Sequence, residues 1–398
     1  MKKAFLVFFL VSSFVISGFS HAAEVTGITD SEIKLGSFLP LSGTLVFLGA
    51  PIKEALVSYF NEVNAMGGIH GRKVTLILED DEYKPARSLA IARKLVTADK
   101  IFAFICNQGT ATNLAAYPYI ESQKIPVVGA LSNSDATTQP PKYYLFTILS
   151  PQSIEGPCLV DYAFRTLKLK SLGMLYQNDE WGGNAYRHTL GHMKKWDKEF
   201  KVVQTFERLA PDLSSQAIKM RDADPEGVIC YALGKEAGLF IKEIHKLGWH
   251  PRLFGAPGLN EERFLKLMGP AAEGMIILSP YYPLYSDKPE IKRFVAAMEK
   301  YYPGSIPSVM GLMGWSAADL FTHCAQKIGR DLTREKLVEA LESVRDYDQG
   351  IGAHLTFTKM DKSPDPRRGA RDFLIGEVVK GRWTQRTDWV RPLEKPLE

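Results

Sequence analysis

The chain has 398 residues, of which 45% are hydrophobic and 24% are charged, and its formal net charge is +4. This length exceeds that of a typical single domain and predicts two domains with large cores. Because lysine and arginine form no dense stripe along the sequence, the composition gives no indication of a nucleic-acid partner.

The first residues have the pattern of an export signal. A short basic start precedes the apolar stretch 4–16, and the tripeptide at 20–22 fits the small-x-small rule for signal peptidase. We therefore predict that residues 1–23 are a signal peptide and that the mature protein is periplasmic. No later segment holds about 18 uncharged apolar residues in a row, so no other membrane span is expected.

Strands and helices alternate through the first half of the mature sequence. Strands are predicted at 33–38, 74–78, 101–106 and 125–128, and helices after Pro51, from Pro85 to about 97, and over 112–122. Pro51 is expected in the first turn of its helix, where proline is tolerated, and Pro118 is expected to shorten or kink the third helix. This alternation predicts a parallel sheet covered by helices on both faces.

The same alternation restarts after Pro151. Strands are predicted at 171–176, 201–206, 227–231 and 252–255, and the helices between them at 154–167, 183–200, 214–223 and 235–247. The last part predicts helices at 289–301, 308–328 and 333–344, followed by a strand pair at 355–357 and 373–379. We therefore expect an α/β protein with two Rossmann-like lobes, a hinge near 147–151 and an interlobe cleft, the usual ligand site of such folds.

The third strand ends in a polar segment, FICNQGTATNLAA at 104–116. Asn107, Gln108 and Thr110 carry neutral hydrogen-bond donors, and the helix that follows presents free N–H groups, which favour an anion. Leu131 and Ser132 follow the next strand and are expected beside this tip. The two tips predict a cradle for a ligand carboxylate, and ordinary helix capping is an equally good interpretation of the same residues.

Other chemistry has weaker support in the sequence. Cys106 could be a nucleophile, but no histidine motif offers it a base, and a cysteine at a strand end is more often a small buried hydrophobe. The four cysteines show no CxxC spacing, and the P-loop, GxGxxG and HExxH motifs are absent, so neither a metal nor a cofactor is expected. Asp80 and Asp81 are expected to cap the next helix or to meet a neighbouring loop rather than to do chemistry.

We expect structural roles for several large side chains in the last third of the sequence. Trp315, Leu320 and Phe321 fall in an apolar helical pattern and are expected in the core. The arginines at 367, 368 and 371 are expected to form a solvated, charged loop.

Several stretches, in order over nearly the whole mature chain, resemble the type I periplasmic substrate-binding proteins of the branched-chain amino acid (leucine/isoleucine/valine) ABC transporter family. They are IKLG at 33–36 with LPLSG at 39–43, NEVNAMGGIHGR at 61–72, the Asp pair at 80–81 with Pro85, YQNDEWG at 176–182, and AEGM at 272–275. The resemblance implies two lobes that close on a ligand by a hinge, three crossover strands and a permease partner. On this basis lobe 1 is 24–147 plus 280–355, and lobe 2 is 148–279 plus 356–398.

The resemblance also implies where the ligand binds. The tips of the third and fourth strands would hold its carboxylate, and an aromatic residue near the first loop and another before the second-lobe glycine would contact its tail. Together with the residues named above, the expected ligand-contacting set is Phe47, Leu48, Asn107, Gln108, Thr110, Ala130, Leu131, Ser132, Trp181, Tyr231, Leu233 and Pro257.

One position departs from the family pattern. Amino-acid binders of the family hold the ligand ammonium with an acidic residue, and Pro257 stands at that position. Glu236, Glu261, Asp179 or Glu180 could replace it, since a buried ammonium needs a carboxylate partner. If none does, the ligand lacks an ammonium group. The first-lobe disulfide of the family is also in question, because Cys106 matches one partner while Tyr83 stands at the other.

We therefore expect a monomeric, non-enzymatic receptor that delivers a small hydrophobic or aromatic carboxylate, or a branched-chain amino acid, to an ABC permease. Two alternatives remain open at this point. One is an exported two-domain hydrolase or oxidoreductase, which the missing catalytic motifs count against. The other is a sensor that reports its ligand to a membrane partner. A fold alone does not identify the ligand.

Overall fold

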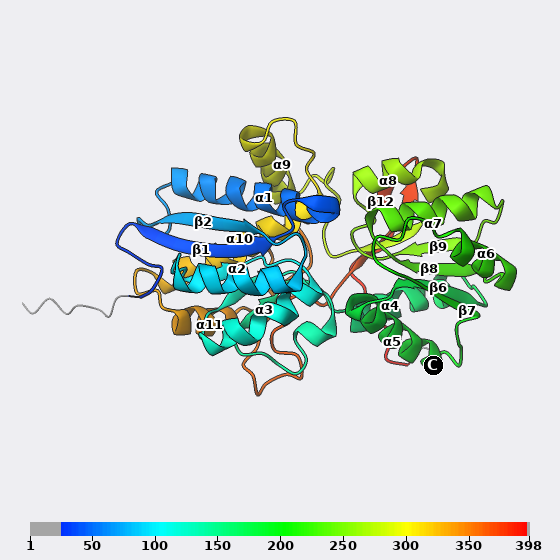
Figure 1. The fold of residues 1–398 in the computed structure, drawn as a ribbon, viewed down its shortest axis with the longest axis horizontal. Coiled ribbons are helices and arrows are strands. Elements are labelled where there is room, and N and C mark those ends of the chain that lie inside the picture. Colours follow the sequence, from blue (N-terminus) through cyan, green and yellow to red (C-terminus); the bar gives the residue numbers. More distant parts are fainter. Residues whose placement is uncertain (1–24, 396–398) are drawn as a thin grey trace, which may run out of the picture.

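The computed structural model describes residues 25–395, which form two α/β lobes side by side (Figure 1). The predicted signal peptide lies outside the described residues. The first sheet is parallel throughout and has the order β2-β1-β3-β4-β5. Its strands are β1 (Glu32–Leu39), β2 (Lys73–Asp80), β3 (Ala103–Ile105), β4 (Val127–Ala130) and β5 (Leu145–Thr147), and the helices of this lobe are α1 (Val46–Ala65), α2 (Pro85–Thr97), α3 (Thr110–Ser122), α9 (Pro289–Tyr301), α10 (Val309–Ile328) and α11 (Arg334–Glu342).

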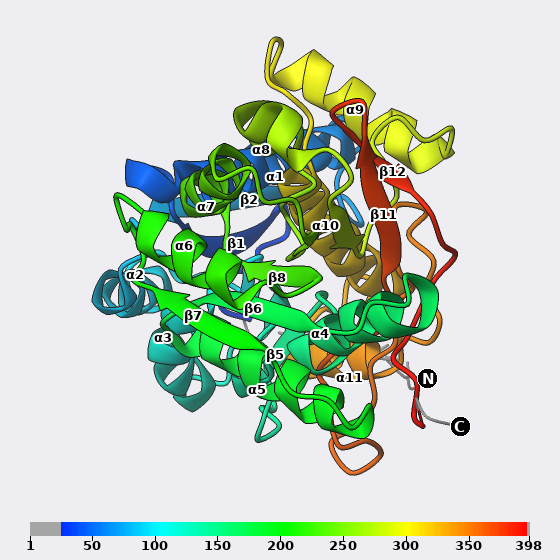
Figure 2. The ribbon, with the colours of Figure 1, turned by 90° about the vertical axis from the view of Figure 1, so that its right-hand side faces the viewer.

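The second sheet has the order β12-β11-β10-β9-β8-β6-β7. It is parallel from β7 to β10, and β11 and β12 join it antiparallel at one edge, as the view from this lobe shows (Figure 2). Its strands are β6 (Leu172–Gln177), β7 (Val202–Phe206), β8 (Gly227–Tyr231), β9 (Arg252–Gly255), β10 (Ile276–Ser279), β11 (Leu374–Val379) and β12 (Arg382–Gln385), and its helices are α4 (Gln152–Asp161), α5 (Glu180–Lys195), α6 (Ser214–Ala223), α7 (Gly234–Lys246) and α8 (Glu262–Met268). Short helical turns complete the chain at η1 (Gly43–Leu45), η2 (Asp135–Thr137), η3 (Tyr162–Thr166) and η4 (Gly269–Ala272).

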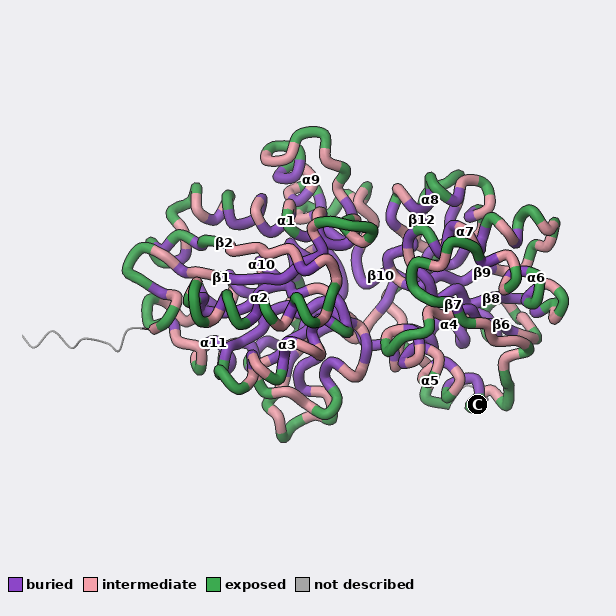
Figure 3. The backbone as a smooth tube through the Cα atoms, viewed as in Figure 1, coloured by how far each residue is buried: buried purple, intermediate pink, exposed green. Residues whose placement is uncertain are grey.

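The expected α/β class with two lobes is confirmed. The central strands of both sheets are buried between helices whose outer faces are exposed, while the edge strands β2, β7 and β12 are only partly buried (Figure 3), a pattern that fits parallel sheets covered on both sides. The chain crosses between the lobes after β5, after β10 and before β11. Phe357 and Ala370 pack in the core of the first lobe, so the last crossing lies beyond them. The predicted boundary at 355/356 does not fit this packing, and the other lobe boundaries drawn from the sequence remain predictions.

The core of the first lobe forms around α1 and α10, and the expectation for Trp315, Leu320 and Phe321 is confirmed because all three are fully buried. The Trp315 indole donates a hydrogen bond to Glu290 at 2.9 Å and packs edge-on against Tyr59. An indole that is fully buried usually finds such an acceptor, which fixes the orientation of its ring.

Helix α1 differs from its prediction. It begins at Val46, so Pro51 lies inside the helix and not in its first turn. Proline has no N–H to donate to the carbonyl four residues earlier, which here belongs to Phe47. That carbonyl instead accepts a hydrogen bond of 2.7 Å from the Arg263 guanidinium of the second lobe. A tertiary contact thus replaces the missing helical bond.

The predicted late strand pair is wrong. The strand over 374–379 is present, but it pairs with β10 and β12, while Leu355 makes only an isolated bridge to Tyr347. The short elements β5, β10, β12 and α8 were not predicted. Each has only three to seven residues, and runs this short carry no periodicity that separates strand from helix.

Candidate ligand-binding cleft

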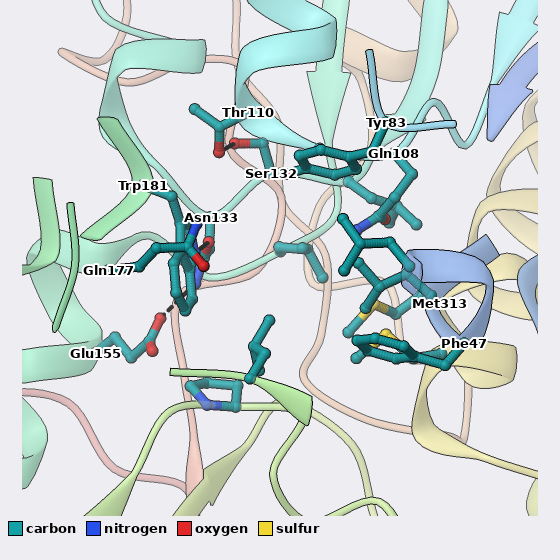
Figure 4. A pocket seen from close by; sticks show the side chains of 18 of the residues that line it. Phe47, Tyr83, Gln108, Thr110, Ser132, Asn133, Glu155, Gln177, Trp181 and Met313 are labelled. Carbon is teal, nitrogen blue, oxygen red and sulfur yellow. Dashed lines mark hydrogen bonds between the residues drawn. The ribbon is translucent and has the colours of Figure 1, made fainter. Parts of the chain in front are cut away.

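The two lobes face each other across a cleft with about 970 Å³ of empty space, including solvent at its open mouth. One side carries polar groups, with Asn133, Glu155, Gln177 and Trp181 close together, and the other carries Phe47 and Met313 (Figure 4). The lining also includes Leu45, Leu48, Tyr83, Gln108, Gly109, Thr110, Leu131, Ser132, Leu149, Ser150, Arg208, Leu233, Glu236, Pro257, Pro280, Met310 and Phe373. As the strand topology requires, the cleft lies at the carboxyl ends of the parallel strands.

The tips of β3 and β4 meet at the cleft as expected. The Thr110 and Ser132 hydroxyls lie 2.9 Å apart, and Ser132 also contacts the Thr137 hydroxyl at 2.6 Å. Gly109 is the N-cap of α3 and offers no side chain to the first turn, so the capping interpretation does not describe this helix. A pair of hydroxyls beside a helix N-terminus has the donors that an anion needs.

Most of the predicted contact residues line this cleft: Phe47, Leu48, Gln108, Thr110, Leu131, Ser132, Trp181, Leu233 and Pro257. Their role in binding remains a prediction.

Three predicted contact residues do not line the cleft. Asn107 is fully buried and its side-chain oxygen accepts a hydrogen bond from Ser37 at 3.2 Å. Ala130 is in the core between the first sheet and its helices. Tyr231 lies beneath Trp181, with ring centroids 4.7 Å apart. In a strand, neighbouring side chains point to opposite faces, so a strand tip brings only some of its residues to the cleft.

The apolar side of the cleft joins the two lobes. The Phe47 ring packs edge-on against Phe264 of the second lobe, with centroids 5.0 Å apart, and the Arg263 guanidinium lies over both rings. Phe47 is therefore fixed by its neighbours before a ligand arrives. Leucine and methionine side chains complete this side and suit an apolar ligand tail.

The sequence analysis missed Glu155, a fully buried carboxyl that lines the cleft from α4. It accepts hydrogen bonds from the Tyr231 hydroxyl and from the Asn133 side-chain amide, the latter at 2.6 Å. In the described residues no cation pairs with it, and burial raises its pKa to about 8. The sequence indicates only that Glu155 lies one turn into the helix that follows the predicted hinge.

Asn133 connects the lobes at the polar side of the cleft. Its side-chain oxygen accepts a hydrogen bond of 2.9 Å from the Trp181 indole, while its amide nitrogen donates to Glu155. Nearby, Asp135 of the first lobe accepts from the Ser153 backbone and hydroxyl and from Asn184 of the second lobe, at 3.0, 2.6 and 3.1 Å. These hydrogen bonds fix the position of the first lobe relative to the second at the polar side of the cleft.

The expectation of a solvated arginine loop is wrong for Arg367 and Arg368, which are fully buried. Arg367 pairs with Glu342 at 2.7 Å. Arg368 donates to the backbone carbonyls of Ser132 and Ser134 at 2.9 and 3.1 Å. It therefore fixes the loop that carries Ser132 and Asn133 and brings a positive charge behind the hydroxyl pair. Backbone carbonyl acceptors of this kind cannot be read from sequence.

The acidic residues considered as ammonium partners have other contacts. Glu261 is buried beside the first turn of α10, where it accepts from the Met310 N–H at 2.7 Å, and burial raises its pKa to about 7. Asp179 caps α5 by accepting from the Gly182 N–H, and Glu180 pairs with an exposed arginine. Only Glu236 lines the cleft, where it accepts from the Leu209 N–H at 2.9 Å.

Asp80 and Asp81 do not cap α2, whose N-cap is Lys84. Asp80 accepts from the Leu41 N–H of a neighbouring loop and from the Glu82 N–H, and Asp81 accepts from the Tyr83 N–H and the Ser88 hydroxyl. All four cysteines are free and buried, so the structure pairs Cys106 with no other cysteine. Within residues 25–395 there is no cluster of potential metal ligands, and none of the helices is long and apolar enough to span a membrane.

Comparisons with known proteins agree with this geometry. A family model described as periplasmic binding protein matches residues 32–382. The leucine-specific-binding protein of Salmonella typhimurium is 21% identical over 287 residues, which cover 72% of this chain and 76% of that protein. The leucine-, isoleucine-, valine-, threonine- and alanine-binding protein of Pseudomonas aeruginosa is 20% identical over 337 residues, covering 84% and 87%.

Two solved structures have the same fold. A fatty acid ABC transporter substrate-binding protein from Thermomonospora curvata superposes with a TM-score of 0.84 at 23% identity, covering 94% of this chain and 95% of that one. A branched-chain amino acid ABC transporter protein from Thermus thermophilus with bound valine gives 0.83 at 21% identity, covering 91% and 97%. The family model spans nearly all of the described chain, which therefore belongs to the periplasmic binding protein family, a family of solute-binding proteins.

Proposed function

We propose that this protein is the periplasmic solute receptor of an ABC importer and that its ligand is a small organic acid with an apolar body. The observation that carries the proposal is the hydroxyl pair of Thr110 and Ser132 at the N-terminus of α3, which faces an apolar side of the same cleft. The hydroxyls and helical N–H groups would take the carboxylate, and Phe47 and Met313 would contact the apolar body.

The proposal includes capture without chemistry. Burial raises the pKa of the Cys106 thiol well above its ordinary value, so it is a poor nucleophile. The Cys106 thiol also has no base beside it in the described residues, where its one hydrogen-bond contact is the Met313 carbonyl. Binding, lobe closure and delivery to a membrane permease account for the remaining features.

A branched-chain amino acid is the second candidate. Relatives named for leucine, isoleucine and valine favour it, and Glu236 and Glu155 are two carboxyls that an ammonium group could reach in the cleft. Two observations count against it: Pro257 stands at the position where relatives are expected to hold the ammonium, and within residues 25–395 no charged partner keeps Glu155 ionised.

Thermal unfolding of the mature protein against a ligand panel tests the proposal. The panel contains leucine, valine, phenylalanine, 4-methylpentanoate, benzoate, cinnamate and octanoate. A ligand at about a hundred times its dissociation constant stabilises the native state by roughly 2.7 kcal/mol. We expect an acid without an amino group to raise the melting temperature most. Stabilisation by amino acids alone would favour the second candidate, and stabilisation by no member would contradict both.

A double variant, Thr110→Val with Ser132→Ala, checks the location of the site. Both changes remove a hydroxyl and leave the side-chain volume nearly unchanged, and we expect them to remove the stabilisation by the acid. Thr97→Val at the exposed end of α2 is the matched control, because its hydroxyl contacts only the Arg93 carbonyl of its own helix. Equal ligand shifts in wild type and double variant would show that the carboxylate binds elsewhere.

A further inference from the structure

Arg208 of the second lobe extends across the cleft to the first lobe. It follows β7 by two residues, and its guanidinium carbon lies 5.2 Å from the centre of the Tyr83 ring in the first lobe. Both side chains line the cleft, and Arg208 is exposed, so this contact forms part of the rim. A guanidinium stacked on an aromatic face in this way gains from cation–π attraction and keeps its N–H donors free.

The Tyr83 ring places Arg208 at the carboxylate end of the cleft. The ring lies against Gly109, where a Cβ atom would come within 2.5 Å of a ring carbon. Gly109 has a positive φ of 102° and directly precedes the first turn of α3. The close-up shows Tyr83 in the same part of the cleft as Gln108, Thr110 and Ser132 (Figure 4). Through Tyr83, the positive charge of Arg208 is brought to the end of the cleft where Gly109 and the start of α3 lie.

Three acidic residues of the second lobe, among them the sequence neighbour Glu207, have other hydrogen-bond partners. Glu207 accepts from the Asn178 side chain at 2.6 Å, Glu236 accepts from the Leu209 N–H, and Asp179 caps α5. In the part of the chain that the structure describes, no carboxylate lies within ion-pair distance of the Arg208 guanidinium. Arg208 therefore stands at the cleft rim without a direct ion-pair partner among the described residues.

We propose that Arg208 pairs with the carboxylate of the bound ligand and thereby selects ligands that carry a net negative charge. This inference rests on the proposed function and names a specificity-determining residue for it. The pair of Thr110 and Ser132 would hold the carboxylate from the first lobe and Arg208 would hold it from the second, so the ligand itself links the lobes. A zwitterion gains less, because its ammonium group offsets the charge that Arg208 attracts.

The test compares Arg208→Gln with wild type by calorimetric titration of three probes of the same shape: 4-methylpentanoate, its neutral amide 4-methylpentanamide, and leucine. Loss of a charge-assisted bond should weaken binding of the acid by about tenfold or more while the amide changes by less than about twofold. Arg208→Lys should keep part of the affinity for the acid, because it keeps the charge and loses the planar stack. Added salt should weaken acid binding by wild type more than by Arg208→Gln.

Arg221→Gln is the matched control, an exposed second-lobe arginine on α6 that pairs with Asp222. It should leave all three affinities and the ligand-free melting temperature unchanged. If Arg208→Gln lowers the affinities for the acid and the amide equally, or lowers neither, Arg208 does not distinguish charged from neutral ligands. The inference then fails while the proposed function stands. If wild type binds none of the probes and no acid of the melting panel, both fail.

Discussion

Replacing Glu155 by glutamine should change the pH dependence of stability in a defined direction. Glu155 is fully buried at the polar side of the cleft and accepts bonds from Tyr231 and Asn133, with no cation beside it in the described residues. Burial raises its pKa from the ordinary value of 4.5 to about 8. The folded state therefore holds a proton that the unfolded state releases at neutral pH.

The size of the effect follows from this difference in pKa. Between about pH 4.5 and pH 8 the unfolded chain binds fewer protons at Glu155 than the folded protein, so the free energy of unfolding falls as the pH rises. Each pKa unit corresponds to about 1.4 kcal/mol, which makes the full loss roughly 4–5 kcal/mol. Glutamine is neutral at every pH and keeps an acceptor for Asn133. The free energy of unfolding of the variant should therefore not show this fall with rising pH.

Urea unfolding of wild type and Glu155→Gln at pH 5 and at pH 8.5 measures the effect. The variant should gain a few kcal/mol over wild type between the two pH values, while Glu199→Gln, an exposed control on the same lobe, should follow wild type. Other groups with raised pKa values, such as Glu261, titrate in all three proteins and cancel in the comparison. A constant difference between wild type and Glu155→Gln across this range would refute a buried neutral carboxyl at the cleft.

Three further predictions concern the cleft and its support. Phe47→Ala should weaken acid binding about tenfold in a calorimetric titration, because the apolar side loses its ring against Phe264; Val46→Ala, at an exposed neighbouring position, should bind normally. Arg368→Met should lower the free energy of unfolding by about 3–5 kcal/mol in urea, since it leaves buried carbonyls unpaired; a loss below about 1 kcal/mol would contradict this role. Because all four cysteines are free, dithiothreitol should leave the melting temperature unchanged, and a clear fall would reveal a disulfide.

The fold could largely be predicted because its signals are local. Alternating apolar runs and helical periodicity predicted the strands and helices of both lobes, and the ranges 214–223, 227–231, 252–255 and 289–301 agree with the structure. Predictions failed where a distant residue supplies a missing partner. Arg263 replaces the helical bond that Pro51 cannot make, and α1 therefore begins earlier than the proline indicates.

The site could be predicted only in part for the same reason. Strand tips place Thr110 and Ser132 in the cleft because the topology of parallel sheets fixes where the carboxyl ends meet. Asn107 carries similar donors, but its side chain turns toward Ser37 in the core. Glu155 and Arg368 depend on partners far away in sequence, and no pattern within either segment distinguishes them from exposed charged residues.

The central claim is that this cleft captures an organic acid through its carboxylate and not a zwitterion. The most direct test is a calorimetric titration of the mature wild-type protein with 4-methylpentanoate and with leucine, which share one carbon skeleton and differ by the ammonium group. We expect binding at one ligand per protein for the acid, with a lower dissociation constant than for leucine. Tighter binding of leucine would contradict the claim and would favour the amino-acid candidate.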